Sequence, residues 1–365
     1  MLKNKSGLYF AVSVLIILFL LEVFFFIGIL HYNLMHSDVL SYWQESMSWR
    51  TPFYEHPPMY AWIIALVRTI TFNTINPLAL MISINLLTFA ISVICVYEFV
   101  YHAGINQTFA IFSAFLFGLW PFVGLTFTVM PIADSPAFAF TLGGLVALQK
   151  SRRPLAMFLF ALASLTHKGV WPIIGLIVLA DFYVRHEYFS RRNLAYLGIL
   201  LFPLVTLWIA GSFYHHSIFW LVQPSIKVNT TFGGGYPILD GLIGTFQKGG
   251  TVGIVKGLTV LFFILLSIAT LVASVKVKFT NNIYCIAISL AVLIMFLFSS
   301  AQNVWGPVRY STFLVIPVVF TVYTFVKEKH FKLNAVLWSS ILFLGLYISQ
   351  LAYAWYIKFL HIDNI

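Results

Sequence analysis

Long apolar runs separated by short polar turns recur along the whole chain. The first run, Leu8 to Leu30, carries one charged residue and exceeds the roughly 20 residues that a helix needs to cross a bilayer. Every backbone N–H and C=O inside a bilayer must be hydrogen-bonded within the protein, so spanning runs fold as helices. We therefore predict an all-α polytopic membrane protein with about 11 transmembrane helices. The runs lie at roughly residues 8–30, 77–100, 108–130, 134–149, 154–167, 169–184, 194–213, 253–275, 282–300, 310–326 and 334–357.

The composition excludes several classes of protein. Hydrophobic residues make up 61% of the chain and charged residues 9%, whereas a soluble domain carries about 25% charged residues. This excludes a soluble enzyme and a disordered tail. The net charge of +10 does not indicate nucleic-acid binding, because the basic residues lie between apolar runs. Cys95 and Cys285 both fall inside such runs and predict neither a disulfide framework nor a metal site.

The basic residues set the predicted topology. Cytoplasmic loops of membrane proteins carry an excess of Lys and Arg. With the N-terminus inside and the segment 58–72 not crossing, all four later basic clusters face the cytoplasm. If 58–72 crossed, they would all face outward, so we expect it to be a juxtamembrane surface helix in the first outer loop. The clusters are Lys150/Arg152/Arg153, Arg185/Arg191/Arg192, Lys276/Lys278 and Lys327/Lys329/Lys332.

The predicted organisation is a single membrane domain over residues 1–365. Residues 1–185 form a core with a first outer loop at 31–76, and residues 186–365 add helices and an outer loop at 214–252. We expect the first apolar run to be retained, because no small-residue cleavage site follows it. The composition favours a bacterial plasma membrane. Functional residues often lie on loops held by a rigid scaffold, so the long outer loops predict a site that faces outward.

Acidic residues are the first candidates for chemistry. Asp38 follows the first run and could be a general base or a metal ligand, or it could simply cap a helix. Glu55 and His56 precede two prolines and are plausible ligands of a divalent cation, or else two exposed side chains of a turn. Asp134 opens a helix, where capping alone would explain it. Convergence of the three carboxylates on one vestibule would favour a general-base or metal site.

Basic residues at the same predicted face are candidates for binding a phosphate. His167 and Lys168 interrupt a long apolar stretch, and a Lys there could bind a lipid phosphate or could snorkel to the headgroups. Arg309 and Tyr310 begin a late helix. An Arg suits bidentate phosphate recognition, but this pair could equally anchor the helix in an aromatic belt.

In these residues the chain resembles the GT-C superfamily of membrane glycosyltransferases. These enzymes use sugars carried on polyprenyl phosphates, and the most similar branch includes the lipid A aminoarabinose transferase and the protein O-mannosyltransferases. Two features depart from this pattern: His56 replaces a Lys, and a single acid, Asp38, replaces an Asp-Glu pair. The matching segments, in order, are Asp38, Glu55-His56-Pro57-Pro58-Met59, Asp134, Thr166-His167-Lys168-Gly169, and Arg309-Tyr310 with Pro317.

The resemblance implies an inverting transfer of a sugar from a polyprenyl-phosphate donor to a lipid, cell-envelope glycan or protein acceptor. Asp38 would be the catalytic base. The donor phosphate would be bound by Lys168, Arg309, Tyr310 and His167. Glu55, His56 and Asp134 would hold a divalent metal ion, if one is used, or position the acceptor.

Other classes of protein remain open. A polyprenyl-linked lipid flippase or a secondary transporter usually has internal repeats and ionisable residues near the bilayer midplane. Here the ionisable candidates collect near the predicted outer face, which disfavours that class. A non-catalytic membrane protein would show no dependence on Asp38.

Overall fold

The computed structural model describes residues 6–24, 37–47, 56–120, 123, 131–185, 190–218, 238–247, 249–276, 282–299 and 305–329. Within these ranges the regular secondary structure is entirely helical, which confirms the all-α prediction for this part of the chain. Two predictions fall outside the described residues, namely the role of Glu55 and the last apolar run at 334–357.

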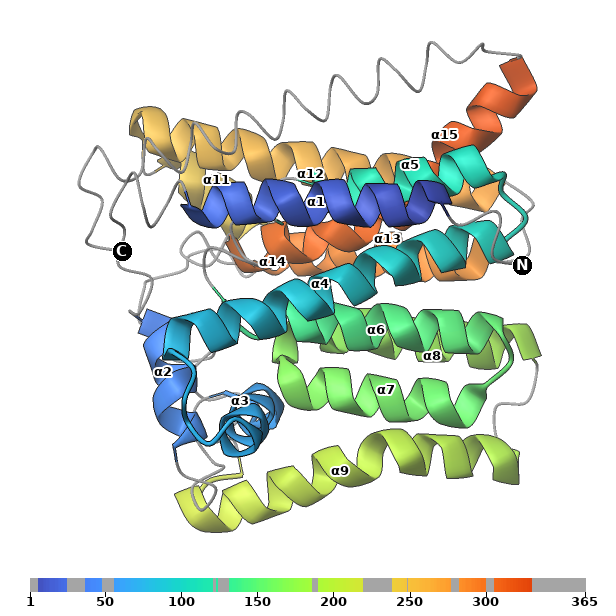
Figure 1. The fold of residues 1–365 in the computed structure, drawn as a ribbon. Coiled ribbons are helices and arrows are strands. Elements are labelled where there is room, and N and C mark those ends of the chain that lie inside the picture. The colour runs from blue at the N-terminus through green and yellow to red at the C-terminus, as the bar shows by residue number, and fades with distance from the viewer. Residues whose placement is uncertain are drawn as a thin grey trace.

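Helices occupy each predicted apolar run that the structure describes (Figure 1). The described helices, of which α2, α3 and α11 lie outside these runs, are α1 (Ser6–Phe24), α2 (Ser37–Ser46), α3 (Met59–Ile70), α4 (Pro77–His102), α5 (Gln107–Gly118), α6 (Asp134–Gln149), α7 (Arg153–Thr166), α8 (Trp171–Arg185), α9 (Arg191–His215), α11 (Asp240–Gln247), α12 (Gly250–Lys276), α13 (Asn282–Leu297), α14 (Trp305–Tyr310) and α15 (Val315–Lys329), with the 3-10 turns η4 (Lys168–Val170) and η5 (Ser311–Leu314).

Side-chain caps explain where several of these helices begin. Asn76 accepts hydrogen bonds from the backbone N–H groups of Leu78 and Ala79, and Pro77 occupies the first turn of α4. Asn106 and Ser190 cap α5 and α9 in the same way. Such caps satisfy N–H groups that have no partner within the helix, so they fix the boundaries between successive apolar helices.

Within the described residues, five helices are long and apolar enough to cross a membrane: Ser6–Phe24, Pro77–His102, Arg191–His215, Lys256–Lys276 and Gly306–Lys327. In the same part of the chain, four further apolar helices, including α5 and α7, are shorter. The count of eleven spans therefore stays a prediction. Large apolar side chains also lie on the outside, such as Phe10 (65% exposed) and Phe202 (72% exposed). An exposed apolar surface of this kind fits contact with lipid tails.

The long helices lie side by side, and the chain reverses at each end of the bundle (Figure 1). The turn between α6 and α7, the last turn of α8 and the first turn of α9 lie at one end. The start of α6, the turn between α7 and α8, and the helix α14 lie at the other, together with α2 and α3. The predicted inner clusters and the predicted site thus occupy opposite ends, although the orientation in a membrane remains a prediction.

Helices α2 and α3 lie across the end of the bundle rather than along it (Figure 1). A small apolar core joins them to α4 through Tyr42, Tyr60 and Leu80. Arg68 links the two helices, because it donates a hydrogen bond to the Ser46 carbonyl (3.1 Å) and lies over the Trp43 ring (4.8 Å). The structure thus confirms a helix within 58–72, and the position of α2 and α3 at a membrane surface stays a prediction.

The range 214–252, expected to be one long outer loop, is not loop throughout. Helix α9 continues to His215, α11 spans Asp240–Gln247, and α12 begins at Gly250. Asp240 lies in the first turn of α11, where the positive end of the helix dipole favours a carboxylate. That local signal could have predicted the short helix.

Candidate functional site

Asp134 lies at the centre of the candidate site. It is the first residue of α6 and is completely buried. Its Oδ2 accepts a hydrogen bond from Arg309 Nη1 (2.7 Å), and its Oδ1 accepts one from the Tyr310 hydroxyl (2.8 Å). Charge-assisted bonds of this length are among the stronger hydrogen bonds in proteins. Both carboxylate oxygens are therefore already used to hold Arg309 and Tyr310.

A buried polar network fixes the turn that leads into Asp134. The Tyr60 hydroxyl donates to the carbonyl of Pro131 (2.9 Å) and lies 2.8 Å from Asn85 Oδ1. The Asn85 amide donates to the Ile132 carbonyl (3.0 Å), and Ser135 Oγ donates to the Asn85 carbonyl (2.9 Å). Buried polar groups that satisfy one another rigidify their surroundings. Helices α3 and α4 therefore set the position of the start of α6.

Aromatic stacking places Arg309 and Tyr310 against α6. The Phe138 ring lies one helical turn beyond Asp134 and stacks on Tyr310 with the ring planes 3° apart, and on Phe313 with centroids 4.2 Å apart. Arg309 Nε is buried and has no hydrogen-bond partner among the described residues. A buried donor without a partner is costly, so this nitrogen is available to donate to a bound ligand.

His167 is the fourth residue that packs against this group. It lies between α7 and η4, and its Nδ1 contacts the Tyr310 hydroxyl and accepts a hydrogen bond from the Gly169 backbone N–H (3.0 Å). Its Nε2 lies 3.9 Å from Asp134 Oδ1. Because Nδ1 accepts the hydrogen bond from Gly169, it carries no proton in this geometry. Asp134, His167, Arg309 and Tyr310 are called the Asp134 cluster below.

Gly169 gives a first test of this packing. A Cβ atom at residue 169 would overlap the Tyr310 ring. We expect Gly169→Ala to push the Tyr310 hydroxyl away from Asp134 and to lower the free energy of unfolding by about 1–3 kcal/mol, the usual cost of overpacking. Chemical denaturation in detergent would measure this.

Gly175→Ala is the matched control for that measurement. Gly175 lies on the adjacent helix α8, and a Cβ atom there would have no neighbour within 4 Å among the described residues. Because Ala favours a helix over Gly, we expect this variant to be as stable as the wild type or more so. Equal stability of the two variants would contradict the tight contact at Gly169.

Asp38 lies near the Asp134 cluster but is not buried in it. It is exposed, in the first turn of α2, and it interacts electrostatically with Arg309 and Tyr42. Tyr42 is buried and also interacts electrostatically with Asp134. The structure therefore brings the predicted base, Asp38, and the predicted phosphate-binding Arg309 to the same end of the bundle. The carboxylate of Asp38 is exposed there, whereas that of Asp134 is buried.

His56 has a partner that the sequence analysis missed. Its Nδ1 lies 3.2 Å from Oε1 of Glu45, a buried carboxylate that also accepts a hydrogen bond from Ser41 (3.2 Å). The His56 ring packs against Tyr42, with centroids 4.6 Å apart. The spacing of Ser41 and Glu45, one turn apart in α2, predicts their own hydrogen bond but not the pairing of Glu45 with His56. His56 also interacts electrostatically with His167, which places it beside the Asp134 cluster.

The predicted metal site is only partly described. Glu55 lies outside the described residues. Among the residues that the structure describes, no group of three or more His, Cys, Asp or Glu is arranged to hold a metal ion. Asp134 has both oxygens engaged, and His56 is paired with Glu45. The divalent metal therefore stays a prediction.

Lys168 completes the set of predicted residues. It is half-buried in η4, adjacent to His167, with which it interacts electrostatically. Asp38, His56, Asp134, His167, Lys168, Arg309 and Tyr310 thus all lie at one end of the bundle, on five separate parts of the chain.

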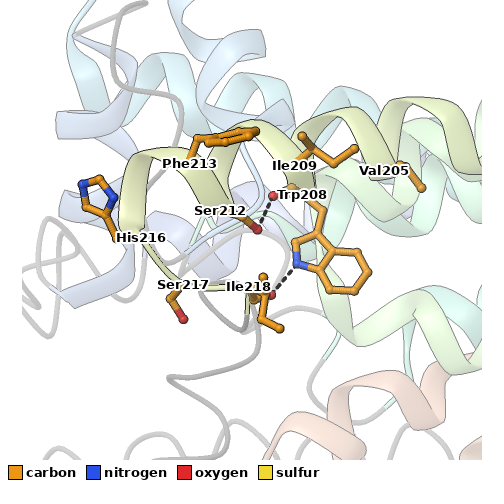
Figure 2. A pocket seen from close by; sticks show the side chains of 8 residues that line it. All are labelled: Val205, Trp208, Ile209, Ser212, Phe213, His216, Ser217 and Ile218. Carbon is orange, nitrogen blue, oxygen red and sulfur yellow. Dashed lines mark hydrogen bonds between the residues drawn. The ribbon is translucent and has the colours of Figure 1, made fainter.

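A pocket of about 630 Å³ lies apart from these residues, along the last turns of α9 (Figure 2). Its lining is almost entirely apolar, and the Trp208 indole N–H donates to the Ile218 carbonyl across it. None of the predicted site residues lines this pocket. The lining residues are Val205, Trp208, Ile209, Ser212, Phe213, His216, Ser217 and Ile218.

Comparisons of the chain with models of protein families, with curated proteins and with solved structures found no match.

Proposed function

We propose that the protein is an integral membrane glycosyltransferase of GT-C type. It moves a sugar from a polyprenyl-phosphate donor to a lipid, cell-envelope glycan or protein acceptor, with inversion at the anomeric carbon. One observation carries this proposal: the exposed carboxylate of Asp38 lies within electrostatic range of Arg309, which Asp134 anchors at the end of a bundle of apolar helices. The same residues carry the resemblance to the GT-C superfamily.

Asp38 is the base in this proposal. Its exposure leaves it accessible to an acceptor, and a positioned carboxylate can take the proton of an attacking hydroxyl or amine. The acceptor atom then bonds to the anomeric carbon from the face opposite the phosphate. The bond between that carbon and the phosphate oxygen breaks, and its electron pair leaves with the polyprenyl phosphate.

Arg309 and Lys168 balance the charge of the leaving phosphate. Arg309 Nε is a buried donor without a partner in the described part of the chain, and Lys168 lies on the adjoining turn. Cationic donors fixed in advance stabilise charge that develops on a leaving group. Asp134 holds Arg309 and Tyr310 in place and is therefore a positioning residue in this scheme.

The proposal is tested with purified wild-type protein in liposomes and a panel of radiolabelled polyprenyl-phosphate sugars, with a crude lipid extract as acceptor. We expect label to move from at least one donor to an acceptor, and the anomeric configuration of the product to be opposite to that of the donor. Liposomes without protein are the control. A donor that crosses the bilayer without transfer of its sugar would contradict the proposal in favour of a flippase.

A further inference from the structure

Five arginines gather at the end of the bundle opposite to the Asp134 cluster. Arg152 precedes α7 and Arg153 is its first residue. Arg185 ends α8, and Arg191 and Arg192 begin α9. We call these five residues the arginine cluster. The sequence explains them only as markers of the cytoplasmic side, but the structure adds how they are held.

Asp181 ties the three helices together at this end. Its Oδ2 accepts hydrogen bonds from Arg153 Nε (2.8 Å) and Nη2 (2.6 Å), and its Oδ1 accepts bonds from Arg185 Nε (3.1 Å) and the Tyr284 hydroxyl (3.0 Å). Arg153 Nη1 also donates to Asn193 Oδ1 on α9 (3.0 Å). These bonds fix Arg153 and Arg185 directly, and they join the starts of α7 and α9, where Arg152, Arg191 and Arg192 lie.

The arginine cluster has a fixed excess of positive charge. Asp181 is the sole carboxylate among the described residues 150–185 and 190–218, and both of its oxygens are already engaged. Arg152, Arg191 and Arg192 are exposed, and the Arg185 side chain is 35% exposed. Among the described residues, these four arginine side chains are therefore accessible and outnumber the single engaged carboxylate, and the neighbouring Lys150 is paired with Glu98 of α4 (3.1 Å).

The positions of these arginines oppose the usual helix preference. Arg153 lies in the first turn of α7, and Arg191 and Arg192 lie in the first turn of α9. The N-terminus of a helix is its positive end, so cations are unfavourable there and anions are favourable. An anion bound near the starts of α7 and α9 would offset the repulsion between these arginines and the positive helix ends.

The same helix offers an apolar surface beside the charge. Leu194, Leu201 and Phe202 of α9 are 54%, 46% and 72% exposed. A ligand that fits this surface has an anionic head and an apolar tail. Arginine, more than lysine, matches a phosphate through two parallel N–H bonds. We propose that the arginine cluster binds the phosphate headgroup of an anionic phospholipid, whose acyl chains lie along α9.

Native mass spectrometry of the full chain tests the proposal. The protein is released from nanodiscs of phosphatidylglycerol and phosphatidylcholine in equal amounts. We expect retained lipid to be enriched in phosphatidylglycerol, and the enrichment to fall at least threefold in the double variant Arg191→Gln/Arg192→Gln. Both arginines are exposed, so we expect the variant to fold with an unchanged melting temperature.

A second double variant, Lys276→Gln/Lys327→Gln, is the matched control. It removes the same charge from exposed residues near the ends of α12 and α15. Retained enrichment in this control would support a specific site. An equal loss in both variants would overturn it in favour of general attraction to the membrane, and competition by soluble glycerol phosphate would overturn it in favour of a free phosphate ester. None of these readouts depends on sugar transfer, so the result is independent of the proposed function.

Discussion

Replacement of Asp38 by Asn is expected to lower the rate of sugar transfer by about 10²- to 10⁴-fold, the usual contribution of a general base. The amide keeps the size of the side chain but cannot take a proton from the acceptor. Because Asp38 is exposed and lies outside the buried packing, we expect the variant to fold as the wild type does. Initial rates over a range of donor concentrations would show a lower kcat with a similar KM.

Asp240→Asn is the matched control for this experiment. Asp240, like Asp38, lies in the first turn of a short helix between longer apolar helices. We expect its replacement to leave the transfer rate within a factor of about two, because the half-buried Asp240 lies in the first turn of α11, where a carboxylate contributes mainly through the helix dipole. Equal transfer by wild type and Asp38→Asn would remove Asp38 from the mechanism and direct attention to Glu55.

It could be predicted from the sequence that the candidate site residues share one end of the bundle. Basic clusters placed Asp38, Asp134, His167 and Arg309 at one end of the bundle, and the structure brings them to one end. Charge patterning succeeds at this level because successive apolar helices must alternate in direction. It could not predict that Asp134 and Arg309, 175 residues apart, pair directly and that Asp134 is enclosed.

The hydrogen-bond partners of buried polar side chains could not be predicted from the sequence. Asp181 lies inside an apolar run, where an ionisable residue predicts a buried partner. Nothing local identifies that partner as Arg153, 28 residues away, or Tyr284, 103 residues away. The pair of Glu45 and His56 depends likewise on how α2 folds back onto the start of α3. Such pairings follow from packing between helices, which periodicity does not encode.

The pairing of Asp134 with Arg309 predicts a large loss of stability. We expect Asp134→Leu to lower the free energy of unfolding by about 3–5 kcal/mol, because it leaves the largely buried guanidinium without its counter-charge. Tyr310 loses the acceptor of its hydroxyl in the same variant. Chemical denaturation in detergent would measure the change, and transfer of sugar should fall below detection because Arg309 is no longer held.

The double variant Asp134→Leu/Arg309→Met separates the structural role of the pair from its role in catalysis. With both charges removed, apolar side chains fill the site, and most of the lost stability should return. Transfer should stay absent, because no guanidinium remains to bind the phosphate. If the double variant were as unstable as Asp134→Leu alone, the unpaired charge would not be the cause. If transfer returned with stability, Arg309 would serve the fold alone, and Lys168 would have to carry the phosphate.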